Sequence, residues 1–423
     1  MPTTTHCHDG RGSRPRAISS VFVSLSGETR EPLPERFRTL KQNLVAGHED
    51  AVVKSWSRLL KSLREENETI AAKGPAIIPS VEFSSLDSDI DHLKDEMKKR
   101  GAVVVRGVVD EKEARGYKEE VEAYVRKNPS TKAFPADNPQ VYELYWSLPQ
   151  LKARGHPNLL KRWERDGYGK TGTYDAIFRG DWEGYDPWEV SARVHAVQDL
   201  YNGAGACSMF RMFQGWLSMS TAGPREGTLL VNPLVKHTTA YLLLRPFFQP
   251  LREDVSGAEF LREENWVFTA GEGMNSELHG ATAGHCQELN GKLHPHLELG
   301  RTMVHMPKIK PGDFVAWHAD QIHAVDMVHE GKGDSSVLYI PVCPLTDQNV
   351  WYLKRQREAF LEGLPGPDFP GGKGERDHVG RPGEDAIVAP EARRAMGLEA
   401  LQVAGEGEGE RALLKRANEY MGF

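Results

Sequence analysis

The stretch that decides the fold is Pro311-Gly-Asp-Phe-Val-Ala-Trp-His-Ala-Asp-Gln-Ile-His323. Its Pro-Gly-Asp opening is typical of a tight turn, and the apolar run that follows predicts a short buried strand. This strand would deliver His318 and His323 to its far end, with Asp320 between them. The stretch therefore predicts a polar site at a strand end inside a β-rich domain.

The residue types in this stretch allow a metal site, and two interpretations of it stay open. Non-haem iron proteins bind Fe(II) with two histidines and one carboxylate, which His318, Asp320 and His323 could supply. On a regular strand, however, His318 and Asp320 share a face while His323 points the other way. Without a turn after Asp320, His318 and Asp320 are instead expected to be hydrogen-bonded groups, with Asp320 orienting a histidine.

The segments around this stretch predict an α+β fold. Many short apolar runs separated by turn residues fill 205–345 and indicate a sandwich or barrel, with candidate strands at 208–220, 228–233, 239–248, 303–307, 314–317 and 335–341. A long insertion at about 250–300 interrupts them. Before them, residues 31–130 have mainly helical periodicity, including a helix over 50–71, and contain one buried strand over 101–109. Asp110 is expected to cap the helix that follows this strand.

Composition excludes several classes of protein. The chain has 423 residues and a formal net charge of −7, which argues against a nucleic-acid binder. No apolar run reaches the roughly 18 residues that span a bilayer. The four cysteines are scattered without a Cys-x-x-Cys motif, so we expect reduced thiols and a cytoplasmic protein, although Arg11, Arg14 and Arg16 leave a weak transit-peptide alternative. A small-molecule substrate is the expected partner, and the oligomeric state stays open.

Several stretches carry a family resemblance. The strand over 101–109 and the Pro-Gly-Asp stretch resemble parts of phytanoyl-CoA-dioxygenase-type enzymes. More closely, the chain resembles the DUF1479 family of Fe(II)/2-oxoglutarate oxygenase-like proteins in 210–216, 226–230, 241–248, 294–297, the Pro-Gly-Asp stretch and 335–341. The resemblance implies a double-stranded β-helix, or jelly-roll, core, Fe(II) and 2-oxoglutarate as cofactors, and His323 as the distal iron ligand. It implies a single oxygenase-like domain over 31–345 and a C-terminal extension over 346–423, and the polar composition of residues 1–30 predicts a mobile N-terminus.

One departure from the family pattern concerns the other iron ligands. The family has a His-x-Asp just before a Glu-Arg-Trp-Glu-like stretch, which Lys161-Arg-Trp-Glu164 matches here. An earlier family segment, 153–160, directly precedes that stretch, so the join near Leu160–Lys161 is interpreted as an internal deletion. Only His156-Pro-Asn158 has a similar pattern in this region, and its Asn158 is a neutral substitute for the carboxylate of the motif. Two hypotheses follow: an oxygenase of an unidentified small molecule, or a truncated or inactive relative.

The anchor for 2-oxoglutarate also departs from the wider pattern, because residues 324–354 contain no arginine after the distal histidine. Arg245 and Arg211, each expected on an apolar strand face, are the candidate substitutes, and Ser336 could add a hydroxyl contact. A guanidinium pairs well with a carboxylate ligand. The alternative is that each arginine forms a buried structural ion pair.

Histidines of the insertion are the remaining metal candidates. His294 and His296 alternate on an expected extended segment, but no cysteine or third histidine stands at structural-zinc spacing, so we expect a polar loop. His279 and His285 are expected to be exposed to solvent.

Overall fold

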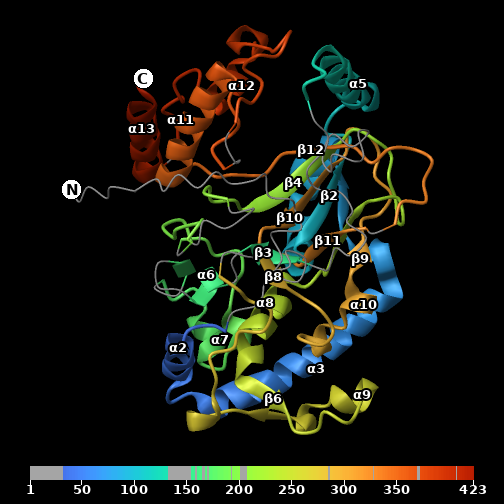
Figure 1. The fold of residues 1–423 in the computed structure, drawn as a ribbon, viewed down its shortest axis with the longest axis vertical. Helices are drawn as coiled ribbons and strands as arrows, with labels where there is room; N and C mark the ends of the chain where they lie inside the picture. Colours follow the sequence, from blue (N-terminus) through green and yellow to red (C-terminus); the bar gives the residue numbers. More distant parts are fainter. Residues whose placement is uncertain are drawn as a thin grey trace.

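The computed structural model describes residues 32–131, 154–157, 160–163, 167–168, 171–191, 193–200, 207–283, 286–326, 328–368, 372–405 and 407–423. The N-terminal segment 1–30, expected to be mobile, lies outside these ranges. Figure 1 shows the strands above the long helix α3 (Glu49–Lys73), with the C-terminal helices on the opposite side of the strands. The described chain is therefore a mixed α+β structure.

Two five-stranded sheets form the β part. The first has the order β1-β2-β10-β4-β12 and the second β8-β3-β11-β5-β9, while β6 and β7 form a separate pair. The strands are β1 Ser80–Glu82, β2 Ala102–Arg106, β3 Arg154–Pro157, β4 Phe213–Ser218, β5 Leu229–Val231, β6 Phe248–Pro250, β7 Trp266–Phe268, β8 Cys286–Glu288, β9 Val304–His305, β10 Phe314–His318, β11 His323–Val325 and β12 Val337–Tyr339.

Strand β10 is the central strand of the first sheet, as the deciding stretch predicts. It pairs antiparallel with β2 on one side and β4 on the other, with Val315 opposite Val104 and Trp216. These three side chains are buried, which agrees with the β-branched and aromatic character of all three strands. The predicted strands at 101–109, 314–317 and 335–341 are therefore confirmed, each a little shorter or longer than expected.

The Pro-Gly-Asp turn depends on Gly312. Its φ is +87°, and a Cβ at this position would lie 2.0 Å from the backbone oxygen of Val109. We expect Gly312→Ala to lower the free energy of unfolding by about 2 kcal/mol or more, because it adds left-handed strain to a backbone clash. Urea unfolding measures this, with Gly291→Ala as the control because a Cβ at Gly291 would meet no atom within 4 Å. Equal stability of the two variants would contradict the expectation.

The helices are α2 Arg36–Val45, α3 Glu49–Lys73, α4 Leu86–Arg100, α5 Glu111–Lys127, α6 Leu160–Trp163, α7 Asp175–Phe178, α8 Val235–Leu244, α9 Gly257–Phe260, α10 Leu299–Thr302, α11 Asp347–Glu362, α12 Pro390–Ala395 and α13 Glu408–Met421. The expected helix over 50–71 is α3. Asp110 caps α5 as expected, since its side chain accepts hydrogen bonds from the backbone N–H groups of Lys112 and Glu113.

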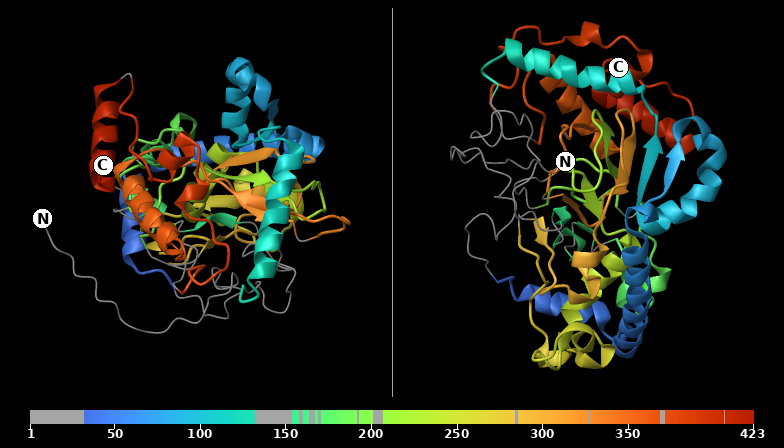
Figure 2. Two further views of the ribbon diagram at one scale, coloured as in Figure 1. Left: turned by 90° about the horizontal axis from the view of Figure 1, so that it is seen from above. Right: turned by 90° about the vertical axis from the view of Figure 1, so that its right-hand side faces the viewer.

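The strand expected over 239–248 is wrong, because Val235–Leu244 form helix α8. Eight of its ten residues are buried, so its sequence is apolar on nearly every side. A short run without polar alternation does not distinguish a buried strand from a buried helix. Helix α8 packs against α3 below the sheets, as Figure 2 also shows.

The C-terminal helices α11 and α13 pack on each other through their own small core of Val350, Ala417 and Met421. Among the residues that the structure describes, no helix combines the length and the apolar character needed to cross a membrane.

Candidate functional site

The candidate site lies at the turn between β10 and β11. His318 ends β10 in the first sheet, and His323 begins β11 in the second sheet, where β11 lies between β3 and β5. The chain thus crosses from one sheet to the other within residues 319–322. This turn is the feature on which the geometry of the predicted site depends.

His318 is buried and has a hydrogen-bond partner at each ring nitrogen. Nδ1 accepts from the backbone N–H of Asp320 at 3.0 Å, and Nε2 lies 3.0 Å from the backbone oxygen of Pro187. This pairing defines a neutral imidazole that carries its proton on Nε2. Neither nitrogen is left with a lone pair to offer to a metal.

Burial lowers the pKa of His318 from 6.5 to about 4, against the smaller opposing effect of the Asp320 carboxylate. The unfolded chain binds a proton at His318 more readily than the folded chain does. The contribution of the buried, neutral His318 to the free energy of unfolding is therefore complete above pH 6.5 and is lost as the pH falls toward 4. We therefore expect the free energy of unfolding to fall between pH 6.5 and 4, with a shallower slope in His318→Gln. Urea unfolding across this range measures the slope, and an unchanged slope would contradict the assignment. The exposed His92→Gln is the control.

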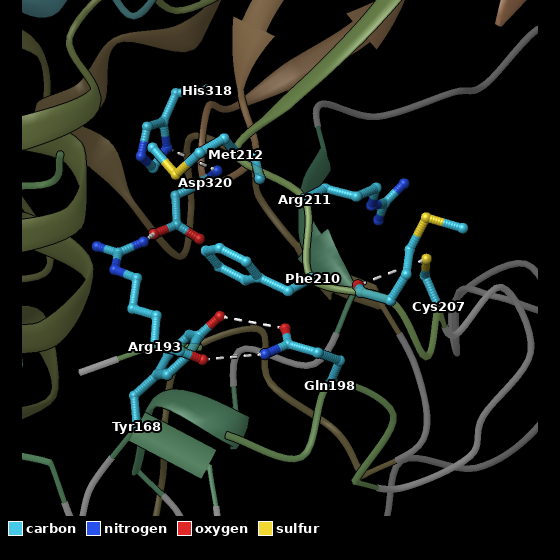
Figure 3. Close-up of a pocket in the computed structure, with 11 residues that line it drawn as sticks. Tyr168, Arg193, Gln198, Cys207, Phe210, Arg211, Met212, His318 and Asp320 are labelled. Carbon is cyan, nitrogen blue, oxygen red and sulfur yellow. Dashed lines mark hydrogen bonds and ion pairs between the residues drawn. The ribbon is translucent and has the colours of Figure 1, made fainter. Parts of the chain in front are cut away.

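Asp320 is held by two buried arginines, as Figure 3 shows in part. Its Oδ2 accepts from Nη1 of Arg193 at 2.8 Å, and its Oδ1 lies 3.1 Å from Nη2 of Arg162. Arg193 also donates from Nη2 to the hydroxyl of Tyr185 at 2.7 Å. These contacts favour the interpretation of His318 and Asp320 as hydrogen-bonded groups over their use as iron ligands.

His323 is the remaining candidate ligand of this stretch. It is half-buried, its Nδ1 lies 2.8 Å from the backbone oxygen of Gln321, and its ring contacts Trp317. Its backbone pairs with Arg154 of β3, the strand that also carries His156. In the ranges that the structure describes, no three His, Cys, Asp or Glu side chains come together as a metal-binding group. The described residues therefore do not fit the facial triad that the family resemblance implies.

Arg245 lies away from this turn. It follows α8, where its Nη1 donates to the backbone oxygen of Phe248 at 2.7 Å and its guanidinium lies over the ring of Trp266. Burial lowers its pKa from the usual arginine value, with Tyr241 as the largest opposing influence. The expected strand face shared with Tyr241 and Leu243 is wrong, because these residues are helical. This position gives Arg245 a packing role in the helical part of the molecule.

Arg211 lies near the β10–β11 turn, whereas Ser336 lies at the opposite end of β10, where its backbone oxygen accepts a hydrogen bond from the N–H of Met219. Arg211 precedes β4 and lines a small cavity beside Asp320 (Figure 3). Ser336 precedes β12 and donates to Asp334 at 2.7 Å, a carboxylate that also pairs with Arg115 and Lys118. Of the predicted anchors, the structure brings only Arg211 next to the Asp320 cluster.

A family model for Gig2-like proteins matches residues 31–162 and 159–398. The chain belongs to the Gig2-like family. A solved structure of GlcNAc Inducible Gene 2, GIG2 (DUF1479), from Candida albicans is 26% identical and covers 93% of this chain and 96% of its own, with a TM-score of 0.77. A Salmonella typhimurium LT2 structure named "Putative Oxidoreductase" is 25% identical, with 87% and 99% covered and a TM-score of 0.66. The uncharacterized protein YbiU of Escherichia coli K12 is 25% identical over 382 residues, which are 75% of this chain and 84% of YbiU.

The histidines of the insertion in this Gig2-like chain are not in a polar surface loop. His294 and His296 are buried, and Nδ1 of His296 lies 3.2 Å from the hydroxyl of Tyr241. His279 is half-buried with its ring 6.5 Å from that of His294, so its expected exposure is wrong. His296 packs against Trp56 of α3 and Tyr241 of α8, and His294 packs against Tyr241. The sequence could not indicate these contacts because they are non-local. His285 lies outside the described residues.

Arg162, Arg193 and Tyr185 are members of the site that the sequence did not reveal. Arg162 lies in α6 within the very stretch, 161–164, that marks the family match, and Arg193 lies in the loop region before β4. The sequence does indicate that Asp320 needs cationic partners, because a carboxylate at the end of an apolar strand requires them once it is buried. The sequence alone did not say which of the chain's many cations those partners would be.

Proposed function

We propose that this chain is an Fe(II)/2-oxoglutarate oxygenase-like protein of the Gig2-like family in which the iron centre is incomplete. In this proposal the chain keeps the jelly-roll scaffold of the oxygenases and a site for a small molecule, without the full ligand set. The internal deletion near Leu160–Lys161 is part of the proposal and accounts for the missing His-x-Asp.

The order of the strands supports the jelly-roll interpretation. From β9 onward the chain alternates between the sheets: β9 and β11 belong to the second, and β10 and β12 to the first. Strands β4 and β5 make the same crossing earlier in the chain. All pairings described within the two large sheets are antiparallel except that of β1 with β2. Alternation of antiparallel strands between two sheets is the winding of a jelly roll.

The observation that carries the proposal is the engagement of His318 and Asp320. This is the chain's own His-x-Asp sequence, and it stands at a strand end where a metal ligand pair would be useful. Both ring nitrogens and both carboxylate oxygens are directed at protein partners instead. A metal would have to displace Asp320 from two buried guanidiniums, which is costly because each would be left unpaired.

Anaerobic titration with Fe(II) and 2-oxoglutarate tests the proposal. We expect a folded protein without stoichiometric iron and without the metal-to-ligand charge-transfer band. Stoichiometric iron with this band would overturn it. A transcript read across codons 158–163 tests the deletion separately, since a longer message restoring a His-x-Asp would identify this chain as an incomplete product of its gene.

A second candidate, an active oxygenase, is favoured by one specific observation. β3, which carries His156, pairs directly with β11, which begins at His323. Two histidines on neighbouring strands are a reasonable start for a metal site, and the name of the Salmonella protein supports oxidoreductase chemistry. Under this candidate, His323→Ala and His156→Ala each abolish binding of Co(II), whereas under the main proposal the wild-type chain already fails to bind it stoichiometrically.

A further inference from the structure

Three sulfur-containing side chains come together where the segment before β4 lies beside the segment after β12. The thiol of Cys343 lies 3.2 Å from Sδ of Met209, and the thiol of Cys207 lies 3.9 Å from the backbone oxygen of Met209. Cys207 is also close enough to Cys343 for its charge to raise the pKa of the Cys343 thiol. In Figure 3, Cys207 lies on the other side of Phe210 from Asp320. We call Cys207, Met209 and Cys343 the sulfur cluster, and none of its members belongs to the β10–β11 turn.

Hydrogen bonds fix the two segments that carry the sulfur cluster. The backbone N–H of Met212 donates to the oxygen of Val342, and the N–H of Val342 donates to the oxygen of Phe213, each at 3.0 Å. Asn349 of α11 accepts a hydrogen bond from the backbone N–H of Phe210 and donates one to its backbone oxygen, both at 2.8 Å. The backbone beside the sulfur side chains is therefore held in place before any ligand binds, which lowers the conformational cost of binding.

Sulfur ligands select particular metals. Thiolate and thioether groups are soft ligands that favour Cu(I), whereas the facial triad of an iron oxygenase uses imidazole and carboxylate groups. Two sulfurs bound to one first-row metal ion lie at most about 4.6 Å apart, twice a metal–sulfur bond of about 2.3 Å. The 3.2 Å between the sulfurs of Cys343 and Met209 is within this limit. Because the cluster joins a methionine to two cysteines, it is compatible with the lack, in the described ranges, of a metal-binding group of three His, Cys, Asp or Glu side chains.

The thiols of the sulfur cluster are protonated in the free protein. Burial raises the pKa of Cys207 and raises the pKa of Cys343 to about 11, and the guanidinium of Arg211 is the largest opposing influence on both. Protonated thiols are poor nucleophiles, so these cysteines are not expected to be reactive in the free protein. A metal ion displaces such protons when it binds. Arg211 then lies near two thiolates and stabilises their negative charge.

We propose that Cys207, Met209 and Cys343 bind one Cu(I) ion through two thiolates and one thioether. Binding releases two thiol protons to solvent, and no electron is transferred. Cys343 is exposed at the surface, which gives the ion a route to the cluster. The site uses none of the residues considered as iron ligands, and it goes beyond the proposed function without depending on it.

Anaerobic competition for Cu(I) tests the proposal. Every protein carries Cys7→Ser, because Cys7 stands between His6 and His8 and these three side chains could also bind copper. Cu(I) is supplied as its complex with bicinchoninate, and its transfer to the full chain is measured from the loss of the absorbance of that complex. We expect the transfer of one Cu(I) ion per chain. A chain that removes no copper from this chelator would overturn the proposal.

Variants locate the bound ion. We expect Cys343→Ser and Met209→Leu to weaken Cu(I) binding, Cys343→Ser by at least about 100-fold, since even the loss of a group outside the ligand set costs about 10–100-fold in metal affinity. The controls are Cys286→Ala on β8 and Met303→Leu before β9, which change the same residue types away from the cluster and should keep the full affinity. An unchanged Cu(I) affinity in Cys343→Ser would place the ion elsewhere and contradict the proposal.

A second measurement keeps the proposal testable should a variant fail to fold. Copper K-edge X-ray absorption of the Cu(I)-loaded chain, with Cys7→Ser as its only substitution, reports which atoms bind the ion. A first shell of sulfur atoms supports the proposal, and a first shell of nitrogen or oxygen atoms overturns it.

Discussion

Replacing Asp320 with asparagine is expected to lower the free energy of unfolding by about 3–5 kcal/mol, the usual cost of removing one partner from a buried ion pair. The carboxylate is the shared acceptor of Arg162 and Arg193, and both arginines are buried. An asparagine has nearly the same shape but leaves both guanidiniums without this carboxylate. The loss of unfolding free energy arises more from these buried, unpaired guanidinium charges than from the lost hydrogen bonds.

Urea unfolding measures this change, with the same dependence of the unfolding free energy on urea concentration used for both proteins. Asp254→Asn is the matched control, because Asp254 pairs with Arg252 on the exposed surface. We expect the control to change stability by less than about 1 kcal/mol. A further readout separates the structural role from a metal role. If Asp320→Asn kept its stability but lost bound Fe(II), the compact His318–Asp320–His323 site would be correct and the ion-pair interpretation would be wrong.

Local patterns in the sequence are sufficient to predict the central strands and the long helices. Strand β10 follows from a glycine turn and an apolar run, and α3 follows from Trp56, Leu59 and Leu63 at helical spacing, all of which are buried. The cap by Asp110 follows from the preference of aspartate for a helix start. In each case the information lies within a few residues of the element that it specifies.

The site could be located from the sequence but not described. The stretch 318–323 follows from the sequence as a polar site at a strand end, yet its chemistry depends on Arg162 and Arg193, which lie more than a hundred residues before it in the chain. Ion pairing at such separation leaves no local pattern. Helix α8 shows the complementary difficulty, because its largely apolar sequence fits either kind of buried element, and the helix packs against α3, which is distant in sequence.

Trp56→Ala is the second substitution with a large expected effect, a loss of about 3–5 kcal/mol of unfolding free energy. Trp56 is 2% exposed and belongs to α3. Its ring stacks on Phe248 with centroids 4.4 Å apart and on Tyr241 at 5.4 Å, and it meets the ring of His296 nearly at right angles. It therefore joins α3, α8, strand β6 and the insertion in one aromatic cluster.

Truncation to alanine would leave a cavity that these rings cannot close, because Tyr241 and Phe248 are fixed by elements that pack on other parts of the core. Trp351→Ala is the control, since Trp351 is 49% exposed on α11 and should cost much less. Urea unfolding followed by far-UV circular dichroism compares the two variants. A loss for Trp56→Ala as small as that expected for the control would mean that the aromatic cluster adds little to global stability, and two separate transitions would mean that the helical part unfolds independently of the sheets. A loss confined to Trp56→Ala, with a single transition, would mean that the cluster and the sheets unfold as one cooperative unit.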